Sequence, residues 1–241
     1  MRRILCTTLP VLALIALATV ATAAEGGGAA KPLSVFDLYL HSMPVGGLLT
    51  ILSFITISLG LTWTFTMRME DLAPPNVSEE IHGLFAEGAT DEAIEQAKGV
   101  VAGMNNMLGN VMLAALEKKD FGYKAMVEAA EEVGAAEHNK YFSKVAWLSL
   151  FSSSATLLGL LGTVTGIIGS FLKMASNPGG VDPNILAANI GEALVCTAMG
   201  IAIGIIGLYF FFFLRNRVNL AAIQTAVYTK EVTDYFRTDQ H

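Results

Sequence analysis

Several polar side chains stand inside otherwise apolar stretches of this 241-residue chain. Thr156, Thr163 and Ser170 are seven residues apart, so a helix would place them on one face, two turns from one to the next. Glu192 and Thr197 stand in a second apolar run. A carboxylate can take up and release a proton, and hydroxyls can hold water or orient such a carboxylate. The pattern therefore predicts a polar path within an apolar interior.

These residues lie in two apolar runs, 147–172 and 190–214, which a short polar loop joins. A helix needs about 20 apolar residues to cross a hydrocarbon core of about 30 Å, so each run is long enough to span a membrane. A charged acid at the bilayer centre costs roughly 2.5–3.5 kcal/mol. We therefore expect Glu192 to face a protein interior, to pair with another group, or to stay protonated.

Glycines form a second pattern in the first run. Gly159, Gly162, Gly166 and Gly169 follow one another at spacings of three, four and three, which gives one stripe on a helix. Small residues in such a stripe allow another helix to approach closely within a membrane. We interpret the four glycines as a helix-packing surface and expect a closely packed partner in a homo-oligomer.

Two motifs and the loop between them resemble a known family. The sequence LLGLLGTVTG at 157–166 is followed by Asp182-Pro183 and by IGEALVCTAMG at 190–200. Their order and spacing resemble the ExbB/TolQ/MotA proton-channel family. The chain is more similar to ExbB and TolQ than to MotA-type stators, which typically have four spans and a larger cytoplasmic domain. The resemblance extends over the chain from about residue 33.

The resemblance implies a proton-channel and motor subunit of an energy-transducing complex. In ExbB and TolQ, five copies surround two single-span partners of the ExbD/TolR type, whose membrane aspartate is alternately protonated and deprotonated. The resulting motion passes force to the outer membrane, with TonB-like or TolA-like proteins as further partners. The family's two pore threonines match Thr163 and Thr197, and its membrane glutamate matches Glu192. The resemblance thus implies a proton path made of these three residues.

The chain departs from the family at two positions. The family usually has proline where this chain has Thr156, and a second proline near Ile206. Without them we expect straighter helices and altered coupling. Two alternatives also stay open from the residues themselves. Thr163 and Thr197 are either proton-path hydroxyls or packing residues, and Glu192 is either a proton carrier or a structural acid bonded across helices.

Composition limits the class of protein. The chain is 53% hydrophobic and 15% charged, which is too apolar for an ordinary soluble domain. Residues 1–23, with Arg2, Arg3, an apolar stretch and Ala-Thr-Ala, are typical of a signal peptide, the alternative being an uncleaved membrane helix. Cleavage would remove two of the 15 basic residues and leave 13 against 21 acidic ones, which argues against a nucleic-acid partner.

The stretch between the first mature span and the second is polar, acidic and helical in pattern. We expect helices at 77–85, 91–98, 104–118 and 123–144, with breaks at Gly88, 99–103 and 120–122. No breaker separates 123–144 from the following span or interrupts the last span before Tyr235. Both long helices are therefore expected to project beyond the membrane.

Basic residues near the span ends set the predicted orientation, because they accumulate on the cytoplasmic side. One side holds Arg68, Lys140, Lys144, Arg215 and Arg217, and the other holds only Lys31 and Lys173. We therefore expect an inner-membrane protein with a periplasmic mature N-terminus. The predicted divisions are a signal peptide (1–23), a periplasmic segment (24–45), a first span (46–67), a cytoplasmic helical domain (68–146), a second span (147–172), a periplasmic loop (173–188), a third span (189–214) and a cytoplasmic C-terminal helix (215–241).

The prediction is thus an all-α membrane protein with three transmembrane helices in the mature chain. A passive membrane scaffold is the main alternative, and it would need the glycine stripe but not the pair Thr163 and Thr197. An enzyme within the membrane would need a nucleophile with a base, or a metal set. Glu192 and the lone mature cysteine Cys196 supply neither, so no catalytic residue, metal or cofactor is expected.

The orientation can be tested by labelling in a Cys196→Ala background. A cysteine introduced at Gly88 should resist an impermeant thiol reagent in intact cells, because the expected cytoplasmic domain contains it. A cysteine at Gly179 should react, since the expected periplasmic loop contains it. The reverse labelling pattern would overturn the predicted orientation.

Overall fold

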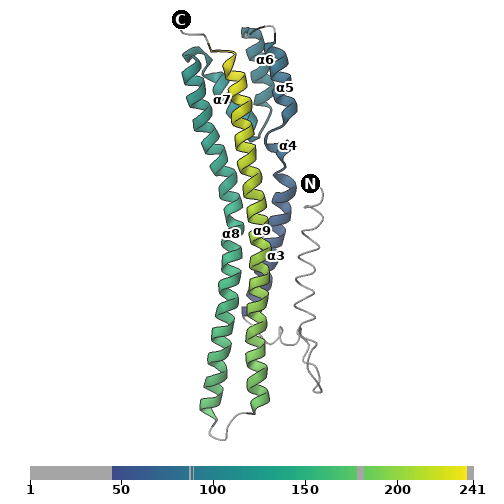
Figure 1. The fold of residues 1–241 in the computed structure, drawn as a ribbon, viewed down its shortest axis with the longest axis vertical. Coiled ribbons are helices and arrows are strands. Elements are labelled where there is room, and N and C mark those ends of the chain that lie inside the picture. The colour runs from purple at the N-terminus through teal and green to yellow at the C-terminus, as the bar shows by residue number, and fades with distance from the viewer. Residues whose placement is uncertain (1–44, 87, 89, 178–181, 238–241) are drawn as a thin grey trace. The chain divides into compact units, whose positions relative to one another are not determined.

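The computed structural model describes residues 45–86, 88, 90–177 and 182–237 (Figure 1). Within these ranges the chain is helical and has no strand. The predicted signal peptide and almost all of the predicted periplasmic N-terminal segment lie outside the described residues. The all-α fold class is confirmed for the part that the structure describes.

Three helices are long and apolar enough to cross a membrane: α3 (Val45–Thr66), α8 (Tyr123–Ser176) and α9 (Pro183–Asp234). Helices α8 and α9 contain 54 and 52 residues. At 1.5 Å per residue each is roughly 80 Å long. Both are continuous, as predicted, because the only proline in either is Pro183 at the first position of α9, where a proline needs no amide hydrogen.

The described residues fall into two compact units, and the first comprises residues 45–60 with 148–210. Its buried apolar centre consists of Leu49, Ala155, Cys196 and Ile203. Large apolar side chains elsewhere on the same helices are exposed, including Phe54 at 77% and Leu157 at 65%. A unit with so small a buried centre and so much exposed apolar surface suits a lipid environment or further protein partners.

The second unit comprises residues 61–147 and 211–237 of the described chain. It contains the short helices α4 (Met69–Leu72), α5 (Pro75–Phe85), α6 (Asp91–Ala102), α7 (Met107–Glu117) and the 3₁₀ turn η1 (Lys119–Phe121). The apolar faces of α5, α6 and α7 form one core with α8 and α9, made of Val77, Ile81, Phe85, Ala93, Ile94, Ala97, Val101, Leu108, Met112, Leu116, Met126 and Val232. This unit therefore has an ordinary hydrophobic core of its own.

Side-chain caps fix where two of the short helices, α6 and α7, begin. The hydroxyl of Thr90 accepts a hydrogen bond from the amide of Ala93, and the side chain of Asn106 accepts one from the amide of Gly109. Each cap satisfies an amide that has no partner within the helix.

The expected break at 99–103 is wrong in extent, because α6 continues to Ala102. Ala97 and Val101, one turn apart, are both fully buried there, which holds the helix past Gly99.

Arg217 of α9 fixes the end of α3. Its Nη1 atom donates hydrogen bonds to the carbonyl oxygens of Thr64 and Met67, at 2.8 and 3.1 Å. The last carbonyls of a helix lack partners within the helix, and a cation there also interacts favourably with the helix dipole. The guanidinium further lies 4.6 Å from the ring centroid of Phe213. A residue used above to predict orientation thus also holds two helices together.

Candidate functional site

The backbones of α8 and α9 approach most closely at two glycines. A Cβ atom placed on Gly159 would lie 3.0 Å from the Cα of Gly200. One placed on Gly200 would lie 2.6 Å from the carbonyl oxygen of Ala155. No side chain fits at such separations, so only glycine allows this contact. The candidate site is built around it.

The predicted glycine stripe faces α9 of the same chain over most of its length. A Cβ atom on Gly162 would lie 3.0 Å from the Cβ of Cys196, and one on Gly166 would lie 2.6 Å from the Cβ of Ala193. At Gly169 it would meet nothing within 4 Å. Three of the four glycines therefore have an intramolecular partner, and the stripe gives no reason by itself to expect a second copy.

A matching stripe of glycines on α9 was not predicted from the sequence. Gly204 and Gly207 follow Gly200 at spacings of four and three, the same small-residue periodicity as on α8. Side chains at these two positions would collide with Thr156 and Ser152 of α8, respectively. Thr156 stands where proline was expected, and its hydroxyl donates to the carbonyl of Ser152 at 3.2 Å within an unbroken helix.

Thr197 makes a hydrogen bond between the two helices at this contact. Its Oγ1 donates to the carbonyl oxygen of Gly159 across the interface, at 2.7 Å. Most threonines in a membrane helix bond back to their own helix. Thr197 reaches the neighbouring backbone because Gly159 has no side chain and Thr197 Cα would lie 3.2 Å from a Cβ placed there.

Thr163 is connected to the same carbonyl. Since α8 is a continuous helix, the amide of Thr163 bonds to the carbonyl oxygen of Gly159 four residues earlier. Its side chain is 9% exposed, and its hydroxyl donates to the carbonyl of Leu160 at 2.7 Å. The amide of Thr163 and the hydroxyl of Thr197 therefore share one acceptor, and both threonine hydroxyls use their proton on a backbone carbonyl.

Glu192 lies near this pair along the chain but on another face. It is separated from Thr197 by five residues, which corresponds to about 140° around a helix of 3.6 residues per turn. The side chain is partly buried, and among the described residues it forms no hydrogen bond or ion pair. Its neighbour Ala193 faces Gly166, so Glu192 stands at the edge of the α8–α9 contact.

Two further hydroxyls of the apolar part of α8 bond to carbonyls of their own helix. Ser170 is 2% exposed and donates to the carbonyl of Gly166 at 2.9 Å. Thr165 is exposed and donates to the carbonyl of Leu161 at 2.9 Å. Within the described chain no group of three His, Cys, Asp or Glu residues is placed to hold a metal ion. The polar groups of the contact are thus hydroxyls and one carboxylate.

Residues 101–225, just over half of the chain, match the MotA/TolQ/ExbB proton channel family. The chain belongs to this family. The matched segment contains the α8–α9 contact with Thr163, Glu192 and Thr197. Together with the three long apolar helices, membership identifies a membrane protein of the channel and transport type and confirms the resemblance to ExbB, TolQ and MotA.

Individual relatives within the family are similar at modest identity. A biopolymer transport protein ExbB of Xanthomonas campestris pv. campestris (strain B100) is 28% identical over 145 residues, which are 60% of this chain and 52% of that protein. Biopolymer transport protein exbB1 of Vibrio cholerae is 37% identical over 98 residues, which are 40% of this chain and 42% of that protein. The chain spans about half the length of these curated relatives.

The close approach at Gly200 predicts a large effect from a single methyl group. Gly200→Ala should destabilise the purified protein by about 1–3 kcal/mol, because the added carbon collides with the backbone of Ala155. Thermal unfolding in detergent measures the effect. Gly191→Ala is the matched control on the same helix, since a Cβ there meets nothing within 4 Å and alanine favours helix. Equal midpoints for the two variants would contradict the proposed packing.

Proposed function

We propose that this protein is the proton-channel subunit of an inner-membrane energy-transducing complex, in which the proton gradient drives a single-span partner of the ExbD/TolR type. The main support is the shared use of the Gly159 carbonyl by Thr163 and Thr197, inside helices that are otherwise apolar. In this proposal the complex acts in outer-membrane transport or envelope maintenance, through a TonB-like or TolA-like protein.

The hydrogen bonds of the two threonines determine which hydrogen-bonding role their hydroxyl groups still have. Each hydroxyl donates its hydrogen to a backbone carbonyl, so its oxygen stays available only as an acceptor. A protonated carboxylic acid or a water molecule can donate to such an oxygen, whereas a carboxylate cannot. The pair is therefore suited to stabilise the protonated form of an acid that a partner helix brings to it.

Glu192 has a separate role in this proposal. It stands near the loop end of its helix and has no protein partner among the described residues. A partly buried carboxylate without a partner attracts water and cations, since burying it dry would be costly. We propose that Glu192 keeps the entrance to the proton path hydrated. It is not one of the groups that accept a hydrogen bond from the protonated acid.

A second copy of the chain is the proposed neighbour of α9 beyond the membrane. Leu220, Ile223 and Val227 follow at helical spacing and are 45%, 61% and 47% exposed. Ile223 lies nine residues after Leu214, the end of the predicted span, which is about 13 Å along a helix. An apolar stripe so far from the hydrocarbon core needs a protein partner, which supports a homo-oligomer with the pentamer as the proposed form.

The orientation predicted from the basic residues is retained in the proposal. Residues 68–146 and 215–241 are placed in the cytoplasm, and the mature N-terminus and the loop before α9 in the periplasm. Arg215 and Arg217, which follow Leu214, and the acidic residues 68–146 then lie on the cytoplasmic side in this proposal.

Removal of the two hydroxyls should impair gradient-driven function without unfolding the protein. Thr163→Val with Thr197→Val keeps nearly the same side-chain shape, but the acid loses its hydrogen-bond acceptors. Loss of one such bond costs about 1–1.5 kcal/mol, so activity should fall about tenfold or more. The measurement is gradient-driven transport in cells that express the complex at matched levels.

The serine variants and a third threonine control this experiment. Thr163→Ser and Thr197→Ser retain the hydroxyls and should retain much of the activity. Thr165→Val removes an exposed hydroxyl that bonds only to its own helix and should have little effect. Full activity of the double valine variant would remove the hydroxyls from the mechanism and leave a passive scaffold as the better description.

The proposed contact between copies predicts a specific assembly defect. Ile223→Glu places a charge in the apolar stripe and should shift the protein toward monomers in native mass spectrometry. Gln224→Glu adds the same charge at the adjacent exposed position and should leave assembly intact. Assembly that is unaffected by Ile223→Glu would exclude this stripe as the interface.

A further inference from the structure

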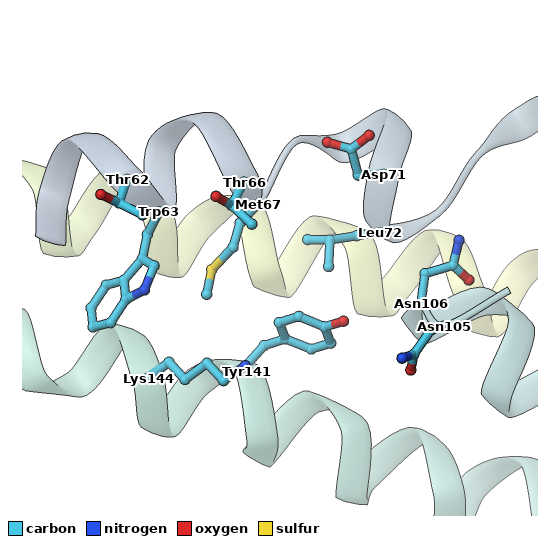
Figure 2. A pocket seen from close by; sticks show the side chains of 10 residues that line it. All are labelled: Thr62, Trp63, Thr66, Met67, Asp71, Leu72, Asn105, Asn106, Tyr141 and Lys144. Carbon is cyan, nitrogen blue, oxygen red and sulfur yellow. The ribbon is translucent and has the colours of Figure 1, made fainter.

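A cavity of about 360 Å³ lies in the second unit between the end of α3 and the cytoplasmic part of α8. Trp63, Thr66, Met67, Tyr141 and Lys144 contribute to its wall, with Asn105 and Asn106 at one end. Figure 2 shows Trp63 above Lys144 and the ring of Tyr141 beneath Met67 and Leu72. The cavity is thus lined by aromatic rings, one cation, one carboxylate and several neutral polar groups.

The place of the cavity along both helices sets its depth in the membrane. Helix α3 ends at Thr66, and the apolar run of α8 begins at Trp147, three residues after Lys144. Trp63 and Tyr141 are the aromatic types that gather where hydrocarbon meets headgroups. With the spans predicted from the sequence, we therefore expect the wall at the level of the lipid headgroups, next to the start of the hydrocarbon core.

Three side chains of the wall can donate hydrogen bonds into the cavity. Lys144 supplies an ammonium, Trp63 an indole N–H and Tyr141 a phenol. Burial, and then the charge of Glu137, raises the pKa of Tyr141, so its phenol stays protonated at neutral pH. Asp71 also contributes to the wall, but in Figure 2 its carboxylate points away from Lys144 and Tyr141.

Two lysines of this part of α8 differ in how their charge is used. Lys140 donates to both carboxylate oxygens of Glu137, at 2.9 and 3.2 Å. Lys144 lies over the ring of Tyr141 at 5.6 Å and, among the described residues, forms no ion pair. Among the described residues, therefore, no carboxylate pairs with Lys144, although Asp71 lines the same cavity.

We propose that this cavity binds the phosphate group of a membrane phospholipid. Lys144 pairs with the phosphate, and the indole N–H of Trp63, which lies above Lys144 in Figure 2, donates to one of its oxygens. Trp147, one turn further along α8 and 53% exposed, continues the same face into the apolar region and contacts an acyl chain. The site goes beyond the proposed proton path and does not depend on it.

Native mass spectrometry of the full complex measures the binding, with phosphatidylglycerol and phosphatidylethanolamine added to the detergent solution. Lys144→Gln should weaken lipid binding about tenfold, since a charged hydrogen bond contributes about 1.5 kcal/mol or more. Lys173→Gln is the matched control on the same helix outside the cavity and should bind as the unmodified protein does. Lys144→Arg keeps the charge and should retain binding. Equal loss of lipid from all three variants, or from none, would overturn the proposal.

Two further arms separate a lipid from a soluble phosphate and test the place of binding. Glycerol 3-phosphate at millimolar concentration should not displace the lipid, and displacement would assign the cavity to a soluble phosphate compound instead. The chain has two tryptophans, so Trp147→Phe leaves Trp63 as the only one. Phospholipids brominated near the headgroup should then quench its fluorescence, and less so after Lys144→Gln. Quenching that is unchanged by Lys144→Gln would contradict binding in this cavity.

Discussion

The contact between Gly159 and Gly200 is the constraint on which the membrane part of this protein depends. Each glycine leaves room for the backbone of the other helix, and the resulting approach brings the hydroxyl of Thr197 to the carbonyl of Gly159. The amide of Thr163 bonds to the same carbonyl oxygen. This one acceptor therefore fixes the position of Thr197 relative to Thr163. A side chain on either glycine would separate the helices and break this arrangement.

The free-energy cost of placing polar groups in hydrocarbon explains why the hydroxyls at this contact bond to backbone carbonyls. Hydroxyls in a membrane helix are tolerated because they bond to backbone carbonyls, and such bonds across helices contribute about 0.6–2 kcal/mol. Thr163 and Thr197 satisfy their donors in this way and keep an acceptor. Glu192 stands at the edge of the contact and has no hydrogen-bond partner among the described residues. Its charge lacks this compensation, so we expect water molecules beside it.

Much of the fold could be predicted from local patterns. The absence of internal proline predicted the unbroken α8 and α9, and apolar length predicted three helices able to span a membrane. Periodicity also gave the small-residue face of α8. It could not say which helix packs there, because a stripe defines a face and not its partner. For the same reason Gly204 and Gly207 were missed, since their role appears only opposite Thr156 and Ser152. The cap that Arg217 places on α3 joins residues about 150 positions apart, and no local pattern records it.

The central claim is that the helix pair with Thr163 and Thr197 conducts protons when a partner helix supplies an acid. Proton flux into liposomes tests it most directly, with a pH-sensitive dye inside the vesicles and an imposed pH gradient. The account predicts flux when this protein and its single-span partner are reconstituted together, and flux near that of empty liposomes for this protein alone. Flux no greater than that of empty liposomes for the assembled complex would contradict the account.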